Sequence, residues 1–167
     1  MNNNINWGII GLGNIAQEIA KSLNLTRNAK LFAIASNTKK KLDQFKNDYN
    51  VSSKNCYSNY QDLLKNKDVD IVYIALPNSL HQKWILKCIE FNKNILVEKP
   101  AFINLGQAKE VFLDPSLKNI FFGESFMFRY HPQIKKTLDL IKKNRIGKII
   151  SMSCNFGINL TNKKKFF

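Results

Sequence analysis

A glycine-rich turn near the N-terminus limits what this chain can fold into more than any other feature. The short apolar run Trp7–Ile10 leads into Gly11-Leu12-Gly13-Asn14-Ile15-Ala16, and apolar residues at helical spacing follow. Gly-x-Gly-x-x-Ala between a strand and a helix is typical of a nucleotide-binding βαβ unit: the first glycine permits a tight turn, and the second lets backbone approach a pyrophosphate. The helix N-terminus adds unpaired N–H groups for phosphate. The alternative is an ordinary strand-to-helix turn without a ligand, and the context of the motif favours binding.

Strand and helix patterns alternate through the first two thirds of the chain. Residues 70–76 form a nearly continuous apolar run, which is typical of a parallel strand covered on both faces. The alternation predicts an α/β fold with a doubly wound parallel sheet of the Rossmann type. Further strands are predicted over residues 30–36, 94–97 and 120–122, a small element over 55–57, and helices over 38–50, 60–64, 105–113 and from Ser79 onward.

The pattern changes after Gly123. A helix is predicted from Pro132, with Gly147 ending it, and residues 150–156 then alternate strictly between apolar and polar side chains. That alternation is typical of a half-solvated antiparallel strand. Because one such strand cannot form a stable sheet alone, we expect a complete nucleotide-binding domain over residues 1–122. Residues 123–167 are then expected to be the truncated start of an α+β second domain.

The positive net charge of the chain favours anionic ligands but does not indicate which kind of anion binds. The formal net charge is +14, but the lysines are scattered through the sequence, whereas a nucleic-acid binder concentrates its basic residues on one face. Nucleic acid is therefore the partner that we rank last.

Cysteine usage and hydropathy indicate the compartment. Cys56, Cys88 and Cys154 are far apart and match no metal-binding spacing, so we expect no metal site and a reducing compartment. The sequence shows no basic-then-apolar signal segment and no apolar run of membrane-spanning length. These features predict a soluble, cytoplasmic protein without a membrane partner.

The end of the second predicted strand bears on the choice of cofactor. An NAD site usually places an acidic residue about twenty residues after the glycine turn, on the ribose hydroxyls. Here Ser36 and Asn37 occupy that place, and the lysines 39–41 follow. Without a carboxylate to repel a 2′-phosphate, NADP is favoured over NAD. The alternative is that these lysines are the solvated start of a helix.

Two further clusters follow strands, where a doubly wound sheet binds its ligands. Leu76-Pro77-Asn78-Ser79-Leu80-His81 places a histidine in the first turn of a helix, where it either faces the cofactor or caps and packs the helix. Glu98-Lys99-Pro100 places a lysine at a strand end, where it can take part in proton transfer. The alternative for Lys99 is a surface lysine in a turn that Pro100 fixes.

Taken together, the three motifs resemble those of the Gfo/Idh/MocA family of NAD(P)-dependent oxidoreductases, whose signature triplet is similar to Glu98-Lys99-Pro100. Residues 124–132 resemble the family segment that enters the second domain. The amino-acid sequence of this segment is most similar to the branch of the family that contains trans-dihydrodiol and xylose dehydrogenases and glucose–fructose oxidoreductase. The resemblance covers almost the whole chain, but only the N-terminal half of a usual family member.

The resemblance implies a role for Lys99, which would contact the substrate hydroxyl and help its proton leave as hydride passes to the nicotinamide. It also implies that Arg129 and His131 border the active site. The implied cofactor-binding residues are Gly11, Leu12, Gly13, Asn14 and Ile15 at the pyrophosphate, Ser36, Asn37, Lys39 and Lys40 at the adenosine ribose or its phosphate, Leu76, Pro77, Asn78 and His81 along the cofactor, and Glu98, Lys99 and Arg129 near the nicotinamide.

The function that follows is hydride transfer between a nicotinamide cofactor, with NADP preferred, and a hydroxyl or carbonyl group of a sugar, polyol or diol. A second acid/base group of the family is expected beyond Phe167, in a protein that forms homo-oligomers at full length. The alternative is a nucleotide-binding module, or an inactive fragment that lacks the catalytic half.

Overall fold

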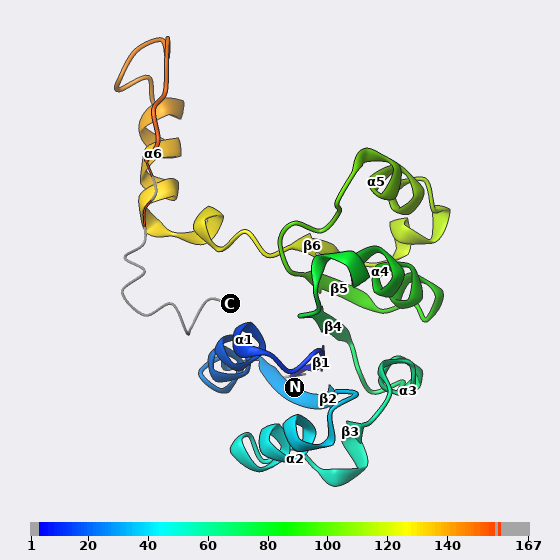
Figure 1. The fold of residues 1–167 in the computed structure, drawn as a ribbon. Coiled ribbons are helices and arrows are strands. Elements are labelled where there is room, and N and C mark those ends of the chain that lie inside the picture. Colours follow the sequence, from blue (N-terminus) through cyan, green and yellow to red (C-terminus); the bar gives the residue numbers. More distant parts are fainter. Residues whose placement is uncertain (1–3, 156, 158–167) are drawn as a thin grey trace. The chain divides into compact units, whose positions relative to one another are not determined.

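The computed structural model describes residues 4–155 and 157, and it divides the chain into two compact units, Met1–Phe126 and Met127–Phe167. The first unit contains one parallel sheet with the strand order β3-β2-β1-β4-β5-β6 (Figure 1). The fold is therefore the predicted doubly wound α/β sheet. Its strands are β1 (Ile5–Ile10), β2 (Ala29–Ala35), β3 (Cys56–Tyr57), β4 (Ile71–Ile74), β5 (Asn94–Val97) and β6 (Phe122–Glu124).

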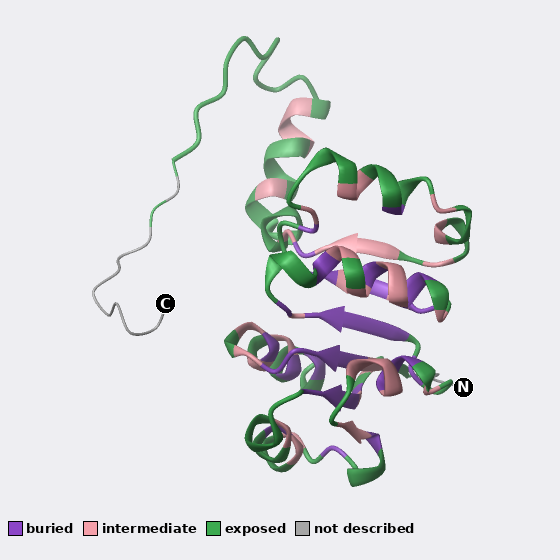
Figure 2. Ribbon diagram, turned by 45° about the vertical axis from the view of Figure 1, so that its right-hand side comes forward, coloured by how far each residue is buried: buried purple, intermediate pink, exposed green. Residues whose placement is uncertain are grey.

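Helices cover both faces of this sheet. One core cluster joins α1 and α2 to the sheet, and the other joins α3, α4 and α5 to the opposite face. All four residues of β4 are buried, as the continuous apolar run predicts, and Figure 2 shows the buried residues gathered in the central strands and the helix faces against them. The helices are α1 (Asn14–Asn24), α2 (Lys39–Asp48), α3 (Tyr60–Lys65), α4 (His81–Glu90) and α5 (Leu105–Phe112), with short 3₁₀ turns η1 (Ser53–Asn55), η2 (Asn78–Leu80) and η3 (Pro115–Asn119).

Asparagine, rather than glycine, ends three of the helices. Asn50, Asn92 and Asn144 have positive φ angles of 52°, 52° and 54°, a conformation that asparagine tolerates better than most L-residues. In each case the following N–H group bonds back to a carbonyl in the last helical turn, which satisfies a carbonyl that the helix leaves unpaired. The bonds are Val51 N–H to Lys46 O at 3.0 Å, Lys93 N–H to Cys88 O at 2.8 Å and Arg145 N–H to Leu140 O at 3.0 Å.

Several element boundaries differ from the sequence prediction, and two of these differences are in the first unit where the chain forms a 3₁₀ turn instead. The strand expected over residues 120–122 lies at Phe122–Glu124, because η3 and the Ile120 N–H to Leu117 O bond occupy the chain immediately before it. The helix expected from Ser79 begins at His81, because residues 78–80 form the separate turn η2. The shift of β6 matters for the site, since it places Glu124 at the carboxyl end of the strand beside Val97.

The first unit closes a few residues after β6. Ser125 still donates its N–H to the Val97 carbonyl at 2.9 Å, so the chain remains attached to the sheet beyond residue 122. That residues 123–167 open a substrate domain stays a prediction.

The second unit contains η4 (Met127–Tyr130) and α6 (Pro132–Lys142). Pro132 opens α6 as predicted, and the His131 ring accepts a hydrogen bond from the Gln133 N–H at 3.2 Å. The helix ends at Lys142, well before Gly147, because Asn144 reverses the chain first.

The antiparallel strand expected over residues 150–156 does not form over residues 150–155, which are exposed. A strand needs a neighbour to pair with, and the described part of this unit has none. Phe156 lies outside the described residues.

Candidate functional site

A groove of about 400 Å³ lies where β1, β2 and β4 end. The connection after β1 leads to α1 on one face, and the connection after β4 leads to α4 on the other. Such a divergence at neighbouring strands is the place where an open α/β sheet binds its ligand. The groove is lined by Gly11, Leu12, Gly13, Ser36, Thr38, Lys41, Tyr60, Ala75, Leu76 and Pro77.

The two glycines of the turn do different work. Gly11 has a φ of +86°, and a Cβ atom there would lie 2.5 Å from the carbonyl oxygen of Ala75. Any larger residue would push β1 and β4 apart. At Gly13, no described atom outside the glycine and its two chain neighbours lies within 4 Å of the position that a Cβ would take. A side chain at residue 13 would therefore project into open space that a ligand can use.

The N-terminus of α1 suits a phosphate group. Gly13 is its N-cap, and among the described residues no side chain makes a capping hydrogen bond and no acidic residue lies in the first turn. The first N–H groups of α1 therefore keep their donor capacity beside the groove, at the positive end of the helix dipole. Ala16 has no exposed surface and allows α1 to pack closely on the sheet.

The end of β2 forms the second wall of the groove. Ser36 is buried, and its Oγ atom accepts the Thr38 N–H at 3.1 Å, so the hydroxyl fixes the turn into α2. Thr38 is the N-cap of α2, but within the described structure its side chain makes no capping bond. Lys39, Lys40 and Lys41 are all exposed at the start of α2, and of these three Lys41 alone is among the residues that line the groove.

His81 has a different place from the one expected. Its side chain has no exposed surface, and its ring nitrogens lie 2.8 Å from the Leu76 carbonyl oxygen and 2.9 Å from that of Pro100. Because both nitrogens face backbone carbonyls, the ring is not available to a cofactor. His81 instead joins the loop after β4 to the loop after β5. The prediction that it lines the cofactor is corrected.

Glu98 is held from two sides at the end of β5. Its Oε1 atom accepts a hydrogen bond from the Tyr73 hydroxyl at a distance of 2.5 Å, and its Oε2 atom accepts a longer one, of 3.3 Å, from the backbone N–H of Lys99. The backbone after Pro100 is held in turn, because Glu124 Oε1 accepts the Ala101 N–H at 2.8 Å. The Lys99 side chain itself is exposed.

The pKa of the Tyr73 hydroxyl is raised well above its ordinary value by the surroundings of the side chain. Burial raises the pKa of Tyr73, and the negative charge and hydrogen bond of Glu98 raise it further, while a hydrogen bond with the Ser125 side chain opposes them. Tyr73 therefore stays protonated and donates its proton to Glu98.

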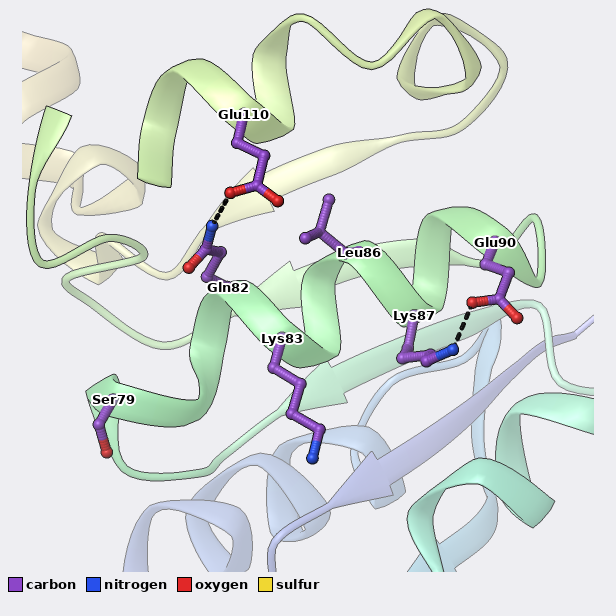
Figure 3. A pocket seen from close by; sticks show the side chains of 7 residues that line it. All are labelled: Ser79, Gln82, Lys83, Leu86, Lys87, Glu90 and Glu110. Atoms are coloured by element: carbon purple, nitrogen blue, oxygen red, sulfur yellow. Dashed lines mark hydrogen bonds and ion pairs between the residues drawn. The ribbon is translucent and has the colours of Figure 1, made fainter. Parts of the chain in front are cut away.

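A second hollow, of about 510 Å³, lies between α4 and α5 (Figure 3). Four of its polar side chains already pair with one another: Gln82 donates to Glu110, and Lys87 contacts Glu90 at 2.6 Å. We interpret it as a solvated surface between two helices. The residues that line it are Ser79, Gln82, Lys83, Leu86, Lys87, Glu90 and Glu110.

Over residues 4–155 and 157, no group of three or more His, Cys, Asp or Glu side chains could hold a metal ion. In the same part of the chain, no helix has the length and apolar character needed to cross a membrane.

The comparison with protein families decides the assignment. A family model described as an oxidoreductase family with an NAD-binding Rossmann fold matches residues 5–113, more than half of the chain. The chain belongs to the Gfo/Idh/MocA family. The resemblance seen in the three motifs is thereby confirmed, and the family assignment supports a nicotinamide cofactor.

Relatives of this Gfo/Idh/MocA chain are about twice as long. A trans-1,2-dihydrobenzene-1,2-diol dehydrogenase of Xenopus tropicalis is 28% identical over 156 residues, which are 92% of this chain and 47% of the relative. The chain thus spans about half the length of the curated relatives it matches.

Two solved structures resemble the chain closely. A 3-ketoreductase from Actinomadura kijaniata, solved with NADP and TDP-benzene, superposes with a TM-score of 0.75 and 30% identity, over 85% of this chain and 43% of that one. The scyllo-inositol dehydrogenase from Lactobacillus casei, with a TM-score of 0.81 and 24% identity over 88% of this chain and 44% of its own, shows the shared fold.

Several residues at the site were not among those that the sequence predicted to contact a cofactor. Tyr73 could have been noticed as a hydroxyl within an otherwise aliphatic buried strand, since a buried hydroxyl needs a partner. Lys41 follows Thr38 by three residues, a spacing that places both on one face of a helix. Tyr60 opens α3 soon after β3 and lines the groove. Arg129 lies in η4 of the second unit, and its contact with a cofactor stays a prediction.

The raised pKa of Tyr73 predicts a specific loss of stability in alkali. Below the unfolded-state pKa of about 10, Tyr73 is protonated in both states and its contribution is complete. Above that pH the unfolded chain loses the proton while the folded chain keeps it, so stability falls by at most about 1.4 kcal/mol per pH unit. Urea unfolding between pH 9 and pH 11.5 should show a steeper decline for the wild type than for Tyr73→Phe. Parallel declines would contradict this assignment.

Proposed function

We propose that the groove at the ends of β1, β2 and β4 binds NADP(H) in preference to NAD(H), and that in a protein of the relatives' length the bound nicotinamide exchanges a hydride with a sugar, polyol or diol. The observation that carries the proposal is the open space at Gly13 beside the uncapped N-terminus of α1. A pyrophosphate fits there because backbone N–H groups and the helix dipole both favour it. Neighbouring Leu12, Asn14 and Ile15 belong to the same turn.

Preference for NADP rests on the charge at the end of β2. No acidic residue lies in the first turn of α2, and Lys41 contributes a positive charge to the wall of the groove. A 2′-phosphate placed near Ser36 and Asn37 meets an attractive field, whereas a carboxylate at that position would repel it. Lys39 and Lys40 strengthen this field from the solvent side.

Residues at the ends of β4 and β5 would handle the reacting part of the cofactor. Leu76, Pro77 and Asn78 form the loop over which the cofactor extends, and Glu98 presents a carboxylate to the ribose that carries the nicotinamide. The exposed Lys99 is the proton-transfer group that contacts the substrate hydroxyl. The hydride chemistry is supplied by the cofactor when it is bound, and these residues orient it and move a proton.

Replacing Lys41 tests the cofactor preference. In titrations followed by nicotinamide fluorescence, we expect the wild type to bind NADPH more tightly than NADH. Lys41→Ala should weaken NADPH about five- to tenfold, the scale of one hydrogen bond to a charged group, and leave NADH nearly unchanged. Lys118→Ala is the control, because Lys118 is an exposed lysine of η3 that does not line the groove. Equal affinity of the wild type for the two cofactors, or equal effects of the two variants, would overturn the NADP preference.

Replacing Lys99 tests the chemical role. In a protein of the relatives' length, Lys99→Ala should lower kcat by roughly 10²- to 10⁴-fold, the usual contribution of a proton-transfer group, while the cofactor Kd changes only a few-fold. Lys118→Ala, an exposed lysine of η3, is the control. A Lys99→Ala protein with wild-type turnover would remove Lys99 from the reaction.

A further inference from the structure

Side chains from three consecutive strand ends meet beside Glu98. Tyr73 on β4 pairs with Leu96 on β5, so Glu98 follows two residues later and lies on the same face of the sheet. The Tyr73 hydroxyl reaches diagonally to Glu98 Oε1 at 2.5 Å. Ser125, which follows β6 and is itself buried, also hydrogen-bonds Tyr73 through its side chain.

This arrangement fixes the carboxylate strongly. Tyr73 has no exposed surface, and its ring packs in the core cluster shared by α1 and the sheet, so its hydroxyl has little freedom to move. A hydroxyl donating to a charged carboxylate is among the stronger hydrogen bonds in proteins. Glu98 is only half-buried and would otherwise be free to turn toward solvent.

The second carboxylate oxygen remains able to accept. Oε2 takes one long contact, 3.3 Å from the Lys99 N–H, and an ionised carboxylate oxygen accepts two hydrogen bonds. With Oε1 directed toward Tyr73, Oε2 is left for a donor from outside the protein.

We propose that Tyr73 is a positioning residue, which anchors Glu98 through Oε1 so that Oε2 accepts a hydroxyl of the ribose that carries the nicotinamide. This inference rests on the proposed function, because it requires a nicotinamide nucleotide in the groove. Tyr73 touches neither cofactor nor substrate. Its effect passes entirely through Glu98, and Ser125 supports it from β6.

Tyr73→Phe removes only the hydroxyl and keeps the ring in the core. The test compares two ligands by isothermal titration calorimetry: NADPH, and adenosine 2′,5′-bisphosphate, which carries the adenosine half without the nicotinamide ribose. We expect Tyr73→Phe to weaken NADPH about five- to tenfold and to leave adenosine 2′,5′-bisphosphate within twofold of the wild type. A purely structural role would weaken both ligands alike, and that result would overturn the proposal.

Two controls isolate the route through Glu98. Tyr49→Phe removes another tyrosine hydroxyl of the same unit, one that donates to the Gln17 carbonyl, and should leave the affinity for both ligands unchanged. In a Glu98→Ala background, Tyr73→Phe should have no further effect on NADPH, because coupled residues are not additive. Additive losses in that double variant would contradict the assigned route.

Ser125→Ala is a second variant that keeps the proposal testable if the Tyr73→Phe protein does not fold. It should weaken NADPH binding by a smaller factor than Tyr73→Phe does, and leave the binding of adenosine 2′,5′-bisphosphate unchanged.

The failure of this inference is distinct from that of the proposed function. A wild type that binds neither ligand overturns both, whereas a wild type that binds both ligands, with NADPH affinity unchanged in Tyr73→Phe and Ser125→Ala, overturns this inference alone.

Discussion

The site depends on how closely β1 approaches β4 where the two strands end. A Cβ atom at Gly11 would lie 2.5 Å from the Ala75 carbonyl oxygen, so only glycine allows the contact, and its φ of +86° turns the chain there. After this point, β1 continues into α1 on one face of the sheet while β4 leads to α4 on the other. The groove is the space that this divergence leaves, and Gly13, the N-cap of α1, borders it.

Hydrogen bonds between loops give the rest of the site its shape. His81 joins the carbonyls of Leu76 and Pro100, and Tyr73 joins β4 to Glu98 on β5. The groups that we propose to act on a cofactor are therefore supported by buried side chains that do not touch it. Such support determines how accurately a functional group is placed. Lys99, which we propose as the proton-transfer group, is exposed beside this network.

Local pattern was enough to predict the fold and the position of the glycine turn. The strands β1, β4 and β5 are apolar runs of the right length, and the Gly-x-Gly-x-x-Ala context is itself a local signal. What local pattern does not contain is the neighbour of each side chain. The sequence around a histidine in a first helical turn is the same whether its ring faces a ligand or two carbonyl groups. His81 is buried because the loop after β5 packs against it and places the Pro100 carbonyl beside its ring. β6 likewise begins two residues later than predicted, because η3 and its C-cap Ile120 occupy the chain where the strand was expected to begin.

The most direct test of the account is where NADPH binds on the 167-residue chain. Amide ¹H–¹⁵N correlation spectra recorded during a titration with NADPH report this residue by residue. We expect saturable shifts concentrated at the amides of Gly11 to Ala16 and Ser36 to Lys41, with adjacent shifts at Leu76 and Glu98. Shifts scattered over the lysine-rich surface, as weak attraction to a net charge of +14 would produce, or no shifts at all, would contradict a nucleotide site at the end of β1.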